Sequence, residues 1–166
     1  GESTDDASEA CPSGGVFVTM VDSNYTVGKG AVLSGNPATT PCIPGVKLSG
    51  DPVARYYNGK IYVINRWQAD NVQILNPSDN YSTVGQYSTD NGSNPQDIAF
   101  ASSQKAYISR LNSGSLLIMN PTNGNPLGTV DLSAYADGDG VPEAARMVTV
   151  GDRLFVALQS VLYIHD

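Results

Sequence analysis

LLIMNPTNG, residues 116–124, and VQILNPSDN, residues 72–80, carry the same pattern 44 residues apart. Each is an apolar run that ends at Asn-Pro and continues into residues typical of turns. Such a run predicts a buried β-strand, and the Asn-Pro pair predicts that the chain reverses directly after it. A repeat at this distance is typical of solenoids and propellers, in which each copy is one supersecondary unit.

The correspondence extends upstream of Asn-Pro and into other parts of the chain. When residues 64–77 are shifted by 44, five of fourteen positions are identical: Ile64/Ile108, Arg66/Arg110, Ile74/Ile118, Asn76/Asn120 and Pro77/Pro121. A partial copy follows at 141–166, and its last strand, VLYIHD, ends where the other copies reach Asn-Pro. VFVTMVDSN, residues 16–24, is interpreted as a further third strand, with Asp22 at the position of Asn120.

Each complete copy contains four strand signals separated by turns. In the copy that covers 94–140 these signals are QDIAFA, KAYISRL, SLLIMN and LGTVDLS. Asn58-Gly59 predicts a two-residue hairpin, and Gly151-Asp152 predicts a similar one in the last copy. Four antiparallel strands in roughly 40–50 residues form a β-propeller blade, so we expect an all-β protein built from propeller-type four-stranded antiparallel blades.

The two complete copies, KIYVINRWQADNVQILNPSDNYSTVGQ and KAYISRLNSGSLLIMNPTNGNPLGTV, resemble the YVTN-type, surface-layer-like β-propeller family of bacteria. Asn76 and Asn120 stand where that family's repeat usually has Asp, whereas Asp22 and Asp166 keep the acid. The likeness covers about residues 15–166. It implies a bacterial extracytoplasmic propeller, and its motifs are informative about the fold rather than about a ligand.

The copies also set the expected boundaries. We expect a flexible acidic leader over 1–14, followed by a partial blade over 15–50, blades over 51–93 and 94–140, and an incomplete blade over 141–166. About three to three and a half blades are fewer than the roughly four to eight of closed propellers. Three alternatives remain open. The chain is a fragment of a longer propeller, or a second chain or head-to-tail strand exchange completes it, or it closes as an unusually small propeller.

Charge and hydropathy narrow the class of partner. The 166 residues carry a formal net charge of −7 without a basic stripe, which argues against nucleic-acid binding. No apolar run reaches about 18 residues, so no membrane span is expected. The polar start GESTDDASEACPSGG resembles the tether behind the lipid-bearing cysteine of bacterial lipoproteins. We therefore expect an extracytoplasmic protein (secreted, periplasmic or on the cell surface), with lipid anchorage upstream of Gly1 as a hypothesis.

Cys11 and Cys42 are the two cysteines, and one histidine leaves too few ligands for a Cys/His zinc site. In an oxidising compartment they would form a disulfide that pins the N-terminal arm and contributes about 3–4 kcal/mol in the chain-entropy model. In a reducing compartment they would be two unpaired thiols. The abundance of Asn, Ser, Thr and Gly favours the disulfide.

The longer loops carry the candidate binding residues: Arg66, Trp67, Asp70, Arg110 and Tyr135. In a propeller, the loops that join second to third and fourth to first strands emerge on one face, where ligands of this fold usually bind. Arg66 and Arg110, at equivalent repeat positions, could form an anion site, or each could pair with a nearby acid. Trp67, the only tryptophan, could contact a protein or glycan partner, or cover the edge of a blade.

Asp137, Asp139 and Glu143 in the Gly-rich loop DGDGVPE could hold Ca²⁺, although the EF-hand spacing fails and an ordinary acidic turn is the alternative. The sequence contains no G-x-S-x-G, phosphate-loop or H-E-x-x-H motif. These features favour a binding or assembly module for a protein or glycan. The alternative is an extracytoplasmic propeller enzyme, a metal-dependent lactonase or lyase, to which Asp97 at the start of an inner strand could contribute.

Overall fold

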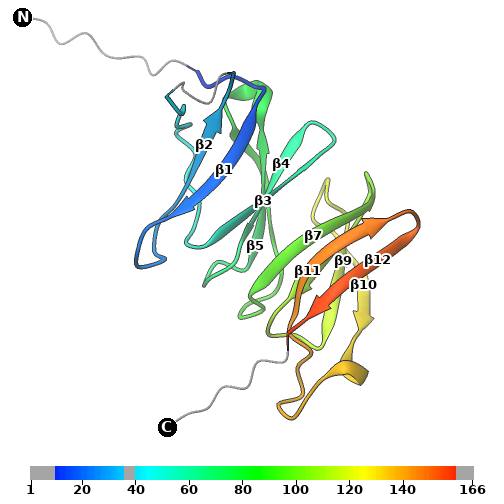
Figure 1. The fold of residues 1–166 in the computed structure, drawn as a ribbon. Helices are drawn as coiled ribbons and strands as arrows, with labels where there is room; N and C mark the ends of the chain where they lie inside the picture. Colours follow the sequence, from blue (N-terminus) through cyan, green and yellow to red (C-terminus); the bar gives the residue numbers. More distant parts are fainter. Residues whose placement is uncertain (1–9, 36–39, 160–166) are drawn as a thin grey trace, which may run out of the picture.

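The computed structural model describes residues 10–35 and 40–159, and within these ranges the protein is all-β (Figure 1). Two four-stranded antiparallel sheets stand between two hairpins, which confirms the expected all-β class and the expected four-stranded antiparallel sheets. In chain order the strands are β1 (Val16–Val21), β2 (Gly28–Leu33), β3 (Pro52–Tyr57), β4 (Lys60–Asn65), β5 (Asn71–Asn76), β6 (Ser82–Ser88), β7 (Pro95–Ser102), β8 (Lys105–Arg110), β9 (Ser115–Met119), β10 (Pro126–Asp131), β11 (Ala144–Val150) and β12 (Arg153–Leu158). Two short 3₁₀ helices, η1 (Pro77–Asp79) and η2 (Ser133–Tyr135), lie in the connections after β5 and β10.

Turn residues determine where the strands reverse. Asn58 and Gly59 have φ of 46° and 77°, the positive values of a type I′ turn, so the predicted two-residue hairpin between β3 and β4 is confirmed. Gly151, with φ of 60°, begins the equivalent turn between β11 and β12. After β5 and β9, the side chains of Asn76 and Asn120 each accept a hydrogen bond from the main-chain N–H two residues later. These side-chain bonds start the turn, which explains why the Asn-Pro pattern occurs twice.

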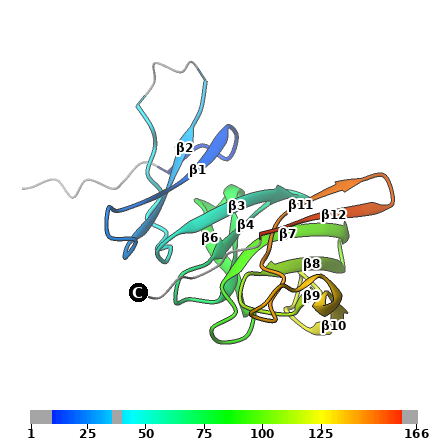
Figure 2. The ribbon, with the colours of Figure 1, turned by 60° about the horizontal axis from the view of Figure 1, so that its bottom comes forward.

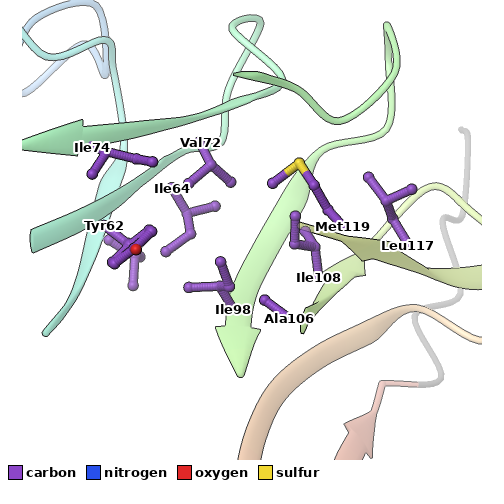
Figure 3. Close-up of a cluster of buried hydrophobic side chains, with 10 residues drawn as sticks. Tyr62, Ile64, Val72, Ile74, Ile98, Ala106, Ile108, Leu117 and Met119 are labelled. Atoms are coloured by element: carbon purple, nitrogen blue, oxygen red, sulfur yellow. The ribbon is translucent and has the colours of Figure 1, made fainter. Parts of the chain in front are cut away.

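The two four-stranded sheets pack face to face through one apolar core (Figure 3). Its buried members come from β3, β4 and β5 on one side and β7, β8 and β9 on the other: Val53, Tyr62, Ile64, Val72, Ile74, Ile98, Ala106, Ile108, Leu117 and Met119. Alternate residues of β4 and β5, including Ile61, Val63 and Leu75, point the other way and pack against the β1–β2 hairpin. The two central strands, β4 and β5, are therefore buried on both faces, and each fully buried branched side chain contributes about 1.5–3 kcal/mol.

In the second strands, the structural repeat differs from the sequence repeat by one residue. Ile64 and Ile108 lie in the same core cluster on facing sheets, so they are not equivalent (Figure 3). Val63 pairs with Gln73, and Ile108 pairs with Leu117, which lies 44 residues after Gln73. The register therefore aligns Ile108 with Val63, an offset of 45. The offset returns to 44 in β5 and β9 because the loop after β4 has one residue more than the loop after β8.

The first strands of successive sheets lie side by side, as β3, β7 and β11 do in Figure 2. Asp97 of β7 joins all three. Its side chain is fully buried, pairs with Arg55 Nε of β3 at 2.8 Å, and accepts a hydrogen bond from Met147 N of β11 at 3.0 Å. Met147 N donates to Asp97 Oδ2, and the main-chain N–H of Ile98 donates to Asp97 Oδ1 at 2.9 Å. Asp97 thus has a structural role in which both of its oxygens are engaged by this chain.

β1 runs in the opposite direction to a third strand. Near its start, Phe17 stacks on Tyr81 with ring centroids 5.3 Å apart, so this end lies beside the connection after β5. Beyond its other end, Tyr25 lines a pocket with Trp67, so that end lies beside the loop after β4. β5 runs between the same two ends in the reverse sense. β1 therefore takes the place that β4 and β8 hold, next to the first strand of the following sheet, and the assignment of 16–24 to a third strand is wrong.

The Cys11–Cys42 disulfide is confirmed, and it ties the start of the described chain to the segment after β2. Cys11 N also donates to Asn80 Oδ1 at 2.9 Å, and the Tyr81 hydroxyl donates to the carbonyl of Pro12 at 2.8 Å. Burial raises the pKa of Tyr81, in agreement with its enclosed position. Cys11 and the residue after it therefore pack near η1, whereas 1–9 of the expected leader lie outside the described residues.

The outer faces of the two terminal hairpins are apolar and exposed. They carry Val148, Val150 and Phe155 at one end, and Val16, Met20 and Leu33 at the other. Val148 pairs with Phe155 and Val16 pairs with Leu33, so each set shares one face of its hairpin. Within the ranges that the structure describes, the four sheets do not close into a ring, and the expected strand VLYIHD (161–166) lies outside those ranges.

Candidate functional site

The two edges of the sheets differ in their connections. We call the edge that carries the connections β4–β5, β6–β7, β8–β9 and β10–β11 the loop edge, and the other the turn edge, with reversals such as 58–59 and 151–152. Main-chain hydrogen bonds join neighbouring connections of the loop edge: Thr89 N to Asp70 O at 2.8 Å, Leu111 N to Asn94 O at 2.9 Å, and Leu132 N to Gly114 O at 2.8 Å. The loop edge is thus one connected surface.

A pocket of about 340 Å³ opens on the loop edge between the β1–β2 turn and the loop after β4. It is lined by Asn24, Tyr25, Asp51 and Trp67. Tyr25 and Trp67 are 56% and 53% exposed, so both rings are accessible to a partner. The sequence singled out Trp67 because it is the only tryptophan, and it gave no comparable signal for the other three residues.

Arg66 holds the acidic wall of this pocket in place. Its Nη2 pairs with Asp51 Oδ1 at 2.5 Å, and its Nε donates to the Asp51 carbonyl at 3.1 Å. Its Nη1 donates to Gln96 Oε1 at 3.0 Å. The guanidinium is therefore engaged by this chain's own groups, and it compensates the charge of Asp51. Arg66 acts here as a positioning residue for the pocket.

The turn that carries Tyr25 is braced by Asp22. Asp22 Oδ1 accepts hydrogen bonds from Thr26 N at 2.6 Å and Val27 N at 2.9 Å, and its Oδ2 accepts one from Thr26 Oγ1 at 2.6 Å. The side-chain hydrogen bond from Thr26, helped by the main-chain bond from Val27, holds the pKa of Asp22 below its ordinary value of 3.8. Tyr25 has φ of 57°, in the left-handed region that bulky residues rarely adopt. The turn therefore presents its tyrosine from a constrained backbone.

Arg110 is buried among the neighbouring loops. It pairs with Asp90 Oδ2 at 2.5 Å, and its Nη2 donates to Ser115 Oγ at 2.9 Å. Asn65 makes the matching contact in the preceding sheet, where its amide donates to Asn71 Oδ1 at 2.9 Å. Arg110 is therefore the structural equivalent of Asn65 rather than of Arg66. The two arginines of the sequence repeat occupy different places, and each has its own carboxylate partner.

Asp70 joins two loops through its carboxylate, which accepts hydrogen bonds from Gly92 N and Asn94 N, both at 2.8 Å. Tyr135 ends η2 in the connection after β10, and its ring is 68% exposed. All five residues expected to contact a ligand or partner thus lie on the loop edge. Trp67 and Tyr135 expose aromatic surface there, whereas Asp70 stabilises the loop structure.

The acidic residues Asp137, Asp139 and Glu143 converge in the connection that follows η2. One carboxylate oxygen of each lies within 4.8 Å of those of the other two, an arrangement that could hold a hard divalent cation. Asp137 Oδ1 and Asp139 Oδ1 also accept main-chain hydrogen bonds at 3.2 Å and 2.8 Å, as they would in an ordinary acidic turn. Across residues 10–35 and 40–159, this is the one group of three His, Cys, Asp or Glu side chains that comes this close.

Comparison with known proteins assigns no family to the chain, because no protein-family model and no curated protein matches it. In the part of the chain that the structure describes, no helix is long and apolar enough to cross a membrane. The loop edge presents the exposed rings of Trp67 and Tyr135, the carboxylate of Asp51 paired with Arg66, and the acidic cluster of Asp137, Asp139 and Glu143.

Proposed function

We propose that this protein is an extracytoplasmic, β-propeller-type binding module whose loop edge recognises a protein or glycan. One observation carries the proposal. The loop edge combines hydrogen-bonded connections with the exposed rings of Tyr25, Trp67 and Tyr135. Aromatic side chains are enriched at binding surfaces because they bury a large area and lose little conformational entropy.

Three further features support the propeller-type and extracytoplasmic parts of the proposal. The four-stranded sheets follow one another with their first strands side by side, which is how propeller blades are arranged. The repeats resemble the YVTN-type family, in which this architecture is found. The Cys11–Cys42 disulfide is compatible with an oxidising compartment.

The test compares binding to an array of bacterial surface proteins and glycans. Labelled wild-type protein is compared with Trp67→Ala/Tyr135→Ala and with Tyr56→Ala, a matched control in β3 whose ring is 70% exposed. We expect the double variant to lose the wild-type signals and Tyr56→Ala to keep them. Equal binding by all three proteins would remove the loop edge as the recognition surface.

Assembly is a second candidate function, and the exposed apolar faces of the terminal hairpins favour it. Equivalent faces of β4, β5, β8 and β9 are buried between sheets, so a further sheet of the same kind, from another copy or another chain segment, would cover Val148, Val150 and Phe155. Light scattering over a concentration series tests this. Association that Phe155→Lys abolishes supports assembly, and a 17.4 kDa monomer at every concentration removes it.

A further inference from the structure

We propose that the pocket formed by Asn24, Tyr25, Asp51 and Trp67 binds a neutral saccharide. The inference rests on the proposed function and narrows it to one pocket and one ligand class. At about 340 Å³ the pocket is at the small end of ligand sites, which span roughly 300–1,000 Å³, and it opens directly to solvent. A site of this size suits one end or one short segment of a larger chain.

The aromatic residues supply the apolar part of the recognition. Trp67 and Tyr25 come from connections more than 40 positions apart, yet both line the same pocket with about half of their surface exposed. A pyranose ring has a C–H face that packs on an aromatic ring, and the ring's polar edge is left free for hydrogen bonds. Trp67 and Tyr25 therefore match the amphipathic surface of a sugar.

The polar residues supply the complementary part. The Asn24 amide can both donate and accept, and the carboxylate of Asp51 accepts. Asp51 Oδ1 is held by Arg66, while 29% of the Asp51 side chain remains exposed toward solvent. Neighbouring hydroxyl groups of a sugar each donate and accept, so they need this mixture of groups rather than a row of one kind.

The charge of the pocket favours a neutral ligand. Asp51 is the one ionisable acid among the four lining residues, and its charge is compensated by Arg66 at 2.5 Å. A cationic ligand would be better served by an uncompensated carboxylate among the rings. An anionic ligand would be better served by an unpaired guanidinium or ammonium. The four lining residues provide neither.

The pocket is also preorganised, which lowers the entropic cost of binding. The Asp22 hydrogen bonds fix the turn of Tyr25, and Arg66 fixes Asp51 next to Trp67. A Cβ at Gly50 would collide with the Tyr25 carbonyl, so the two backbone segments approach closely. Local stability does not explain a tyrosine at position 25, because its ring is half exposed and its φ of 57° would suit Asn or Gly better.

Trp67 is the only tryptophan, so its fluorescence reports on this pocket alone. The wild-type chain is titrated with neutral tetrasaccharides built from glucose, mannose, galactose or N-acetylglucosamine, and with choline as a cationic probe. We expect a saturable shift of the Trp67 emission with at least one tetrasaccharide and a dissociation constant of about 0.1–1 mM. Tyr25→Asn removes one ring and suits the left-handed backbone, so it should fold and weaken binding about tenfold. Tyr56→Ala, an exposed tyrosine of β3 outside the pocket, should bind like wild type.

Three results would overturn the inference. They are no saturable shift with any of the tetrasaccharides, a shift with choline alone, and equal binding by Tyr25→Asn and wild type with unchanged thermal stability. If Trp67→Phe, followed by calorimetry, binds while Trp67→Ala does not, the stacking role is supported. Continued loop-edge binding to arrayed proteins alongside a negative sugar titration would remove the saccharide ligand and leave the proposed function standing.

Discussion

Asp97→Ala tests whether one buried carboxylate holds three sheets together. In the structure this carboxylate accepts two hydrogen bonds from Arg55, at 2.8 Å and 2.9 Å, and one each from the amides of Ile98 and Met147. Its removal separates β3 and β11 from their common partner on β7. It also leaves the part-buried amide of Met147 without this acceptor. We therefore expect a loss of global stability rather than a local change at one strand.

The magnitude follows from burial on the two sides of the ion pair. Removing one partner of a buried ion pair costs about 3–5 kcal/mol, and a hydrogen bond to a charged group contributes about 1.5–3 kcal/mol. The Arg55 side chain is 38% exposed and regains water when Asp97 is lost, so the lower end applies. We expect Asp97→Ala to lower the free energy of unfolding by about 3 kcal/mol and the Tm by about 6–12 °C.

The reverse substitution makes the test sharper. Arg55→Ala should cost at least as much, because it leaves the Asp97 carboxylate buried without a cation. The double variant should cost less than the sum of the single variants by at least about 1 kcal/mol. Thermal and urea unfolding followed by circular dichroism measure all four proteins, with exposed Asp152→Ala as the control that stays within about 0.5 kcal/mol of wild type. Additive losses, or a loss below about 1 kcal/mol for Asp97→Ala, would refute the reasoning.

Three further predictions concern the disulfide, the β1–β2 turn and the acidic turn. Replacing Cys11 and Cys42 by Ser should cost about 3–4 kcal/mol in urea unfolding, from a sequence separation of 31, and an unchanged midpoint would contradict this. The lowered pKa of Asp22 stabilises the fold above pH 3.8, and this contribution is lost as the pH falls through the lower folded-state pKa. The Tm gap between wild type and Asp22→Asn should therefore close in acid, and a constant gap would count against it. Millimolar Ca²⁺ should raise the Tm of wild type more than that of Asp139→Asn, and equal shifts would remove the calcium hypothesis.

The strands could be predicted from the sequence because their ends depend on local chemistry. Asn58 and Gly59 adopt positive φ with little strain, and the side chains of Asn76 and Asn120 bond to the main chain two residues later. These interactions need no tertiary partner. The same pattern in the sequence therefore gives the same strand end and the same turn in both four-stranded sheets.

Strand direction in the first hairpin could not be predicted in this way. Asp22 also binds the turn that follows it through its side chain, but it accepts from the amides four and five residues later, whereas Asn120 accepts from the amide two residues later. The position of that turn in the fold is set by remote contacts, above all Phe17 on Tyr81 and the pocket shared by Tyr25 and Trp67. A turn motif determines a reversal of the chain, and it carries no information about which edge of the sheet the reversal occupies.

The candidate site shows a similar limit. Trp67 could be selected because one tryptophan in a predicted loop is conspicuous, whereas Tyr25 is one of nine tyrosines and Asp51 is one of many acids. Their proximity depends on the close approach of residues 24–25 to 50–51 and on the reach of Arg66. No periodicity in the sequence indicates that these segments approach each other, so the pocket could not be predicted without the structure.

The loop after β4 explains both the one-residue offset in the repeat and the formation of the pocket. This loop has one residue more than the loop after β8, and it contains two left-handed residues, Gln68 and Asp70, with φ of 57° and 47°. The extra residue places Asn65 rather than an arginine at the strand end, so that Arg66 enters the loop and reaches Asp51. In the following sheet the arginine remains at the strand end and is buried. The repeated residues therefore form the two four-stranded sheets, and the one additional residue in the loop after β4 places Arg66 beside Asp51 of the pocket.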